Sequence, residues 1–172
     1  MPIPFSHLDA SGRARMVDVS RKSVTRRVAE ASCRLHLQPT TVARLRDLPK
    51  GDALVVAQIA GVQAAKRTAE LVPLAHPLPL DQIDVELEPQ TEAPGEGGGT
   101  WSGVLVRSRV VVEAKTGAEM EALWACAGAA LALYDMVKAV ERDACITDLR
   151  LEAKRGGRSG AYRRAARRGN PR

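Results

Sequence analysis

The sequence predicts an α+β fold of the ferredoxin-like type, with the element order strand, helix, strand, strand, helix, strand (βαββαβ). Four segments alternate apolar and polar residues, as half-buried strands do, and two longer segments have the apolar composition of core helices. A glycine-rich segment separates the two middle strands. We therefore expect an antiparallel four-stranded sheet with one polar face and two long helices covering the other face.

The first half of the chain is expected to contain one strand and the first long helix. Apolar and polar residues alternate over residues 32–37, which predicts a strand. A short helical segment, residues 41–48, follows and stops at a proline. Asp52 is then expected to cap a long helix over residues 53–71, because an aspartate at this position accepts hydrogen bonds from free backbone N–H groups.

The second half is expected to contain a hairpin, the second long helix and the last strand. Residues 83–88 and 101–115 alternate in polarity, and residues 91–99 between them hold four glycines and a proline. The turn that follows leads into a helix over residues 118–142, and residues 145–154 form the last strand. No internal repeat of 20–50 residues appears in the sequence.

Composition places the chain among ordinary globular proteins. Its 172 residues suit one domain, with 45% hydrophobic and 27% charged residues. No apolar run reaches the roughly 18 residues of a membrane span, and the first residues lack the apolar region of a secretory signal. The three cysteines are far apart and have no metal-ligand spacing, which is typical of reduced thiols. We therefore expect a cytoplasmic protein without membrane contact.

The net charge of +6 belongs to the end of the chain. Eight of the 26 basic residues lie between Lys154 and Arg172, where there is no acidic residue, which leaves 18 basic and 20 acidic residues elsewhere. We expect one domain over residues 1–160, followed by a basic, disordered tail over residues 161–172.

Asp135 and Lys138 are the first candidates for chemistry, because they are polar residues three positions apart on a helix that is apolar over most of its length. The alternative is an exposed ion pair, which contributes little to stability. Glu119 and Glu121 lie at the start of this helix, where the helix dipole favours carboxylates. Glu121 and Asp135 are fourteen residues apart, or roughly 21 Å at ~1.5 Å per residue. Both can serve one site only if the substrate is long or the site combines two subunits.

Three further segments could bind or move charge. His76 lies in a proline-rich segment, where a rigid loop suits proton transfer or binding, although a lone surface histidine is the alternative. Lys66 could bind phosphate or complement the helix dipole, and Lys50 precedes a helix N-terminus that attracts anions. Residues 156–160 resemble a phosphate-binding loop in composition only and lack the Walker spacing, so we interpret them as a flexible exit from the last strand.

Taken together and in order, these segments resemble one known family. The strings MVDVSRKSVTRRVAEA, KGD, IAGVQAAKRTAELVPLAHPL, TGAEMEAL, LYDMVKA and AKRGGRSG are similar to those of the cyclic pyranopterin monophosphate synthase family (molybdenum cofactor biosynthesis protein C, the MoaC family). The resemblance covers residues 9–160. It departs from the family at the segment LAHP, where the family pattern is LCHP, so Ala75 stands in place of a cysteine.

The resemblance implies a phosphorus–oxygen lyase of molybdenum cofactor (molybdopterin) biosynthesis. Its GTP-derived substrate would be (8S)-3',8-cyclo-7,8-dihydroguanosine 5'-triphosphate, and its products cyclic pyranopterin monophosphate, a pterin, and diphosphate. The matching positions imply a catalytic group and a group that contacts substrate: Asp135, Lys138 and Lys50 in the first, and Leu74, Ala75, His76, Met120, Glu121, Glu119 and Lys66 in the second. It also implies a homohexamer built as a trimer of dimers. The sequence indicates no required cofactor. It shows no acidic cluster with metal spacing, so whether Mg²⁺ assists the reaction is left open.

Acid–base catalysis by this group would need a lysine whose pKa is lowered by burial and by neighbouring lysines.

Two other classes of protein are alternatives to an enzyme. A ferredoxin-like nucleic-acid-binding module with a basic tail is the first alternative, but the expected strands offer only Trp101 for stacking bases. The second is a structural oligomerisation domain, in which Asp135 and Lys138 form a salt bridge between subunits.

Overall fold

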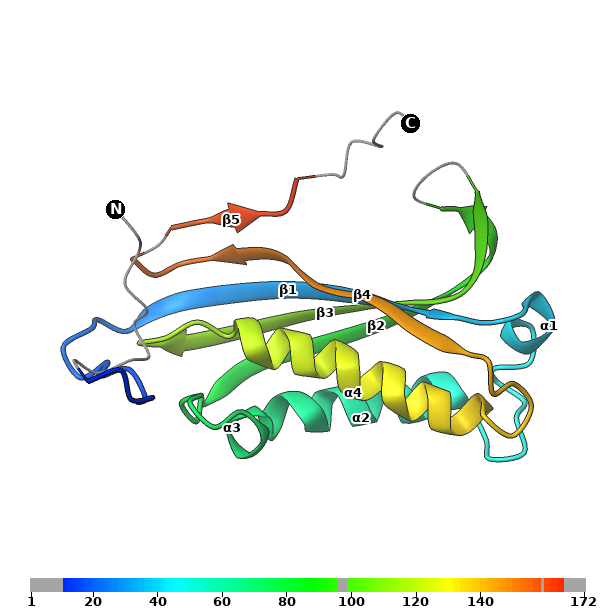
Figure 1. Ribbon diagram of the computed structural model, residues 1–172, viewed down its shortest axis with the longest axis horizontal. Helices are drawn as coiled ribbons and strands as arrows, with labels where there is room; N and C mark the ends of the chain where they lie inside the picture. The colour runs from blue at the N-terminus through cyan, green and yellow to red at the C-terminus, as the bar shows by residue number, and fades with distance from the viewer. Residues whose placement is uncertain (1–10, 96–98, 159, 166–172) are drawn as a thin grey trace.

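The computed structural model describes residues 11–95, 99–158 and 160–165, and these form one antiparallel sheet covered by helices on one face (Figure 1). The strand order β2-β3-β1-β4-β5 contains the ferredoxin-like arrangement of the first four strands, as the sequence predicted. The strands are β1 (Thr25–His36), β2 (Leu80–Pro94), β3 (Thr100–Ala114), β4 (Cys145–Arg155) and β5 (Tyr162–Arg163). The helices are α1 (Pro39–Val42), α2 (Ala53–Lys66), α3 (Thr68–Leu71) and α4 (Glu119–Val137).

Alternation along the central strands produces the two faces of the sheet. In β3, the four valines at even positions from Val104 to Val112 are fully buried beneath the helices, whereas Arg107 and Arg109 lie on the open face. The strand β1 starts at Thr25, seven residues before the expected start, because β3 pairs with it over its whole length. Hydrogen bonding to a long neighbouring strand extends β1 beyond the segment that alternating polarity predicts.

The two long helices begin as predicted and end earlier. The Asp52 carboxylate accepts hydrogen bonds from the backbone N–H groups of Leu54 (2.9 Å) and Val55 (3.2 Å), which confirms it as the N-cap of α2. The helix α2 ends at Lys66, because the Thr68 hydroxyl donates to the Ala65 carbonyl (3.0 Å) and competes with the backbone ladder. The expected continuation to residue 71 is the separate turn α3, and α4 ends at residue 137, not at residue 142.

Small residues let α2 and α4 lie against each other. A Cβ atom at Gly128 of α4 would lie 2.4 Å from the Ala64 Cβ atom of α2, and one at Gly61 would lie 2.8 Å from the Ala125 carbonyl oxygen. By length and composition α4 could cross a membrane, but half of its apolar window is buried inside the fold, as in a core helix. All three cysteines are free thiols; Cys33 and Cys126 are buried in this core, and Cys145 is exposed.

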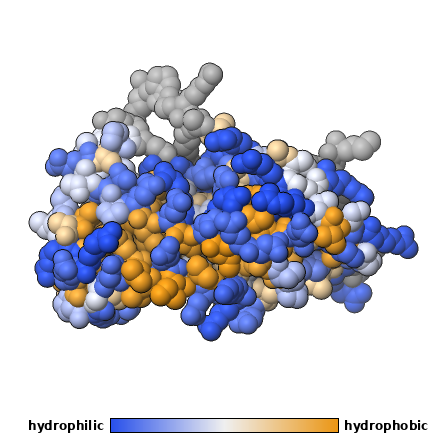
Figure 2. Space-filling view, turned by 180° about the vertical axis from the view of Figure 1, so that it is seen from behind, coloured by the Kyte–Doolittle hydropathy of each residue, from blue (hydrophilic) through white to orange (hydrophobic). Residues whose placement is uncertain are grey.

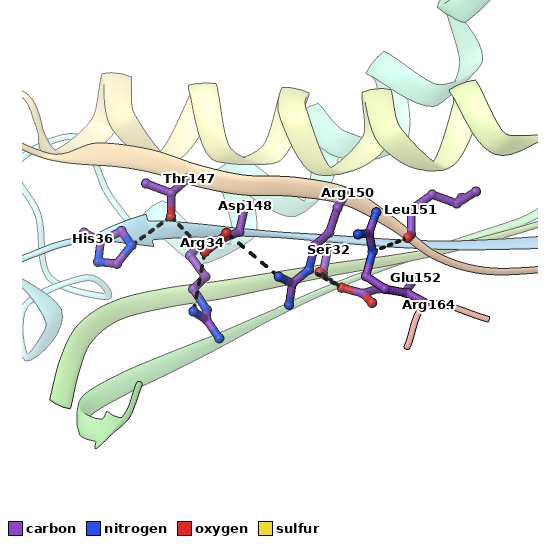
Figure 3. A network of polar contacts seen from close by, with 9 residues as sticks. All are labelled: Ser32, Arg34, His36, Thr147, Asp148, Arg150, Leu151, Glu152 and Arg164. Atoms are coloured by element: carbon purple, nitrogen blue, oxygen red, sulfur yellow. Dashed lines mark hydrogen bonds and ion pairs between the residues drawn. The ribbon is translucent and has the colours of Figure 1, made fainter. Parts of the chain in front are cut away.

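The open face of the sheet carries paired charges (Figure 3). Asp148, at a β-bulge in β4 with a left-handed φ of 54°, contacts Arg34 at 3.4 Å and Arg150 at 3.9 Å. Glu152 accepts hydrogen bonds from the Ser32 hydroxyl (2.6 Å) and from Arg150 Nε (2.8 Å). These pairs neutralise each other, so the face is polar without a strong charge of one sign.

A fifth strand extends the sheet beyond the four that the sequence predicts. The strand β5 pairs with Ala153 and Lys154 of β4, and Arg164 adds hydrogen bonds to the carbonyls of Glu152 (2.8 Å) and Leu151 (3.0 Å). It lies in the segment that we expected to be a tail, and two residues are too few to show alternation. The rest of that expected tail, residues 166–172, lies outside the described residues.

Candidate active site

Lys50, Asp135 and Lys138 meet at the C-terminal end of α4. Lys138 Nζ lies 2.6 Å from Oδ1 of Asp135, and Lys50 Nζ lies 3.1 Å from Oδ2. Lys50 also donates to the backbone carbonyl of Asp135 at 3.0 Å. A tight turn before α2, in which Gly51 has a φ of 101°, carries Lys50 to this place. The structure thus brings together all three residues that the resemblance implies as catalytic.

The electrostatics of this group differ from what acid–base chemistry led us to expect. The hydrogen bond from Lys138, and then the one from Lys50, lower the pKa of Asp135 below its usual value. Asp135 in turn raises the pKa of Lys138 above 10.5, by its hydrogen bond and its charge. The three side chains are about half exposed, at 46%, 55% and 52%. The expectation of a buried lysine with a lowered pKa is therefore wrong for the single chain, because the carboxylate stabilises the ammonium form.

A separate pocket of about 590 Å³ lies at the N-terminal end of α4. It is lined by six of the seven residues expected to contact substrate: Leu74, Ala75 and His76 from the loop after α3, and Glu119, Met120 and Glu121 from the start of α4. Val17 and Val19 close it from the N-terminal segment. The pocket combines apolar walls with a histidine and two carboxyl groups, which suits a flat polar ring, and we call it the ring pocket.

Glu121 is the buried titratable group of this ring pocket. Only 4% of its surface is exposed, and this burial raises its pKa from 4.5 to about 7, with a smaller contribution from the nearby charge of Glu119. A carboxyl group with this pKa is partly protonated at neutral pH, so it can donate a hydrogen bond or exchange a proton. The sequence did not reveal this, because a glutamate in a first helical turn is ordinarily a solvated charge.

Lys66 belongs to neither group. It lines a separate surface pocket of about 580 Å³ between α2 and β2, with Ile83, Asp84 and Glu86. The expectation that it contacts the same ligand as His76 has no support in the geometry of the single chain.

A basic pocket of about 720 Å³ lies next to the ring pocket and was missed by sequence reasoning. Lys22, Thr116, Gly117 and Glu119 line both pockets, so the two form one continuous site. Six cationic side chains line the basic pocket: Arg21, Lys22, Arg27, Lys115, Lys154 and Arg158. Five of them lie within the family strings at the two ends of the domain, but only the folded chain brings these segments and Lys115 together.

The glycine-rich segment after β4 contributes to this basic pocket. Gly157 and Arg158, in the segment that we interpreted as a flexible exit from the last strand, line this pocket. Among the described residues no helix follows this turn, which agrees with the lack of Walker spacing, and the other cations of the pocket come from different segments of the chain. Lys154 lies 2.9 Å from Glu119 and joins β4 to the start of α4.

Metal-binding clusters are absent from the described ranges 11–95, 99–158 and 160–165, where no three His, Cys, Asp or Glu residues could together hold an ion. The charge available to a phosphate ligand in this part of the chain is supplied by lysine and arginine. The described site of this ferredoxin-like protein therefore joins a partly apolar pocket to a strongly basic one.

Comparison with known proteins identifies the family. The sequence profile described as "MoaC family" matches residues 16–157, and this chain belongs to that family. It is 49% identical to the cyclic pyranopterin monophosphate synthase of Streptomyces griseus subsp. griseus over 164 residues, 94% of this chain and 87% of the relative. The proteins of that name from Nocardioides sp. and Chloroflexus aurantiacus are each 48% identical. The first match covers 95% of this chain and 97% of the relative, and the second 93% and 94%.

Proposed function

We propose that this protein is a lyase that converts (8S)-3',8-cyclo-7,8-dihydroguanosine 5'-triphosphate into cyclic pyranopterin monophosphate and diphosphate. The observation that carries this proposal is the union of the ring pocket, which holds His76 and buried Glu121, with the six-cation basic pocket beside it. The substrate has the matching parts, a purine-derived ring and a triphosphate. Relatives at 48–49% identity are named as synthases of this product, which supports the same reaction.

The two pockets divide the work of the reaction. The basic pocket holds the triphosphate, and the ring pocket holds the heterocycle against Glu121 and His76. Attack of a ribose hydroxyl on the α-phosphorus forms one P–O bond, and the bond to the β-phosphate oxygen breaks to release diphosphate. Cations beside the leaving diphosphate stabilise the charge that develops on it. Ring rearrangement needs proton transfers, for which groups with pKa values near neutrality are suited.

The catalytic group Lys50, Asp135 and Lys138 reaches this site from a second subunit in our proposal. In one chain, Glu121 and Asp135 lie at opposite ends of α4, roughly 21 Å apart at ~1.5 Å per residue. A two-fold axis crossing α4 near residue 128, midway between them, would place Asp135 of one chain beside Glu121 of the other. Burial at such an interface would also lower the pKa of Lys138 towards the range of a proton carrier.

Exposed apolar side chains support the pairing of helical faces. Val55, Val56 and Ile59 of α2 are 50%, 41% and 55% exposed, and Leu131 of α4 is 57% exposed. Figure 2 shows a band of hydrophobic surface across the part of the molecule where the helices lie. Three such dimers would form the hexamer that the family resemblance implies. Light scattering tests this assembly; a monomer with full activity at micromolar concentration would refute it.

Complementation of inactive variants tests the shared site directly. Glu121→Gln removes the ionisable carboxyl group of one half of the site, and Lys138→Ala removes the ammonium group of the other half. The two variants are mixed, dissociated and allowed to reassemble, so that half of the dimers contain one chain of each variant. If each site combines two chains, one of the two sites in such a mixed dimer has both residues intact. Activity should return to about a quarter of the wild-type value. Sites contained in single chains would give no recovery.

The reaction itself is tested by incubating the protein with the cyclised GTP derivative and measuring diphosphate. Stoichiometric release of diphosphate, together with a cyclic monophosphate product, is the expected result. Release of neither product would refute the proposed function. We further propose that the protein works in the cytoplasm, as its relatives' biosynthetic role suggests, and without a resident metal.

The nucleic-acid-binding alternative receives no support from the sheet. Trp101, the only aromatic residue that the sequence offered on the expected strands, is packed against His36 with ring centres 5.5 Å apart and beneath Arg34 at 5.1 Å. The open sheet face around it carries paired charges, which does not resemble a platform for stacked bases.

A further inference from the structure

Arg27 is a cation of the basic pocket whose position is fixed by the fold. It lies half-buried on β1, and its Nε donates to the Ala114 carbonyl (2.9 Å) while Nη2 donates to the Lys115 carbonyl (3.0 Å). Its Nη1 makes no hydrogen bond or ion pair to any residue that the structure describes. A guanidinium held by two carbonyls keeps a nitrogen available for a phosphate oxygen, and little side-chain entropy remains to be lost on binding.

Gly157 is the neighbour that leaves room for this guanidinium. It lies in the turn between β4 and β5 with a φ of +77°, and a Cβ atom there would lie 2.2 Å from Nη1 of Arg27 and 2.9 Å from its Cζ. Such distances are well below van der Waals contact, so any other residue at this position would push the guanidinium away from the two carbonyls that hold it.

The adjacent glycine has a different reason to be there. A Cβ atom at Gly156 would lie 2.4 Å from the backbone carbonyl oxygen of Arg26, which cannot move without distorting β1. At Gly157 the obstacle is instead the end of a side chain, which can swing aside. A side chain at Gly157 therefore carries the strain of a positive φ and displaces the Arg27 guanidinium, but it does not overlap the backbone of β1.

We propose that Gly157 is a positioning residue of the basic pocket: the missing side chain keeps Arg27 on its two carbonyls, with Nη1 available to the phosphates of the substrate. This inference rests on the proposed function, because it takes a polyphosphate as the ligand of that pocket. It assigns a role in ligand binding to a turn whose sequence shows only two consecutive glycines.

Binding of inorganic triphosphate to the full chain, measured by calorimetry at one fixed ionic strength, tests the proposal. Gly157→Ala should weaken binding about tenfold, the loss expected for one charge-assisted hydrogen bond. Gly160→Ala is the matched control, since Gly160 also has a positive φ, +69°, but no atom of the described residues lies within 4 Å of its Cβ position. Both variants carry the same backbone strain, so both should lower the melting temperature equally, while Gly160→Ala should bind triphosphate within twofold of wild type.

A double-mutant cycle shows whether Gly157 acts through Arg27. Arg27→Gln should weaken triphosphate binding on its own, and adding Gly157→Ala should weaken it no further. Multiplied losses in the double variant, or wild-type binding in Gly157→Ala, would overturn the positioning role. Unchanged binding in Arg27→Gln would overturn the assignment of the basic pocket as well. Gly157→Asn provides a second variant that tolerates the left-handed backbone if the alanine variant folds poorly.

Discussion

Glu121 makes the stability of this protein depend on pH in a direction opposite to that of most carboxylates. Burial raises its pKa from 4.5 to about 7. The folded protein therefore holds the proton more tightly than the unfolded chain, whose carboxyl ionises near pH 4.5. Between these two values the unfolded state binds fewer protons, so the free energy of unfolding falls as the pH rises. The penalty is absent below pH 4.5 and complete above pH 7.

The size of this effect follows from the pKa difference. A shift of about 2.5 units corresponds to about 3 kcal/mol at ~1.36 kcal/mol per unit. Glu121→Gln keeps the shape of the neutral carboxyl group but cannot ionise. The variant should match wild type near pH 4.5 and become more stable by up to about 3 kcal/mol above pH 7. For a domain of this size that is a melting temperature higher by roughly 6 to 12 °C.

Thermal unfolding of both proteins at one concentration, from pH 4.5 to pH 8, measures this difference. The low-pH comparison is the internal control, because both side chains are then neutral. A difference between the two proteins that stays constant across the range would show that the Glu121 carboxyl is solvated. The reasoning from its burial would then be refuted.

Three other predictions concern catalysis, metal and packing. Lys138→Ala and Asp135→Asn should each abolish turnover. Binding of inorganic triphosphate should stay within twofold, because neither residue lines the basic pocket and its six cations are unchanged. Normal turnover in either variant would leave the two residues as the surface ion pair of the alternative interpretation. Lys138→Arg should also be inactive, since an arginine keeps the charge but does not release a proton, and near-normal turnover there would direct the search for the base to Lys50. Excess EDTA should change turnover less than twofold, because protein cations neutralise the phosphates; a loss above tenfold that Mg²⁺ restores would contradict this. Gly128→Val should lower stability by about 1–3 kcal/mol, as its side chain would overlap Ala64 across the helix contact, and an unchanged urea midpoint would contradict the close packing of α2 and α4.

Local patterns in the sequence were sufficient for the order of elements and for part of the site. Alternation located β3 to within one residue at each end, and Asp52 marked the start of α2, because both signals depend on residues that are near one another in the chain. The family strings also contain both groups of residues that the structure brings together, the three at the end of α4 and six around the ring pocket. These successes rest on short-range physics: burial with a period of two, and capping of free N–H groups.

Contacts between distant segments accounted for what was missed. The fifth strand forms only because Tyr162 and Arg163 find an edge of β4 to pair with, and the basic pocket exists only where strands, a turn and a helix start converge. Neither leaves a periodic pattern, since each member comes from a different part of the chain.

The sequence by itself determined the βαββαβ order, the polar and apolar faces of the sheet and the residues of the family motifs, because these are set by periodicity and by local chemistry. Tertiary structure decided which charges meet. It buried Glu121 and so raised its pKa, it left Asp135 and Lys138 exposed and paired, and it placed Gly157 against Arg27. The physical reason is that a pKa or a phosphate pocket depends on solvent exclusion and on distances across space, which only the packing of the folded chain defines.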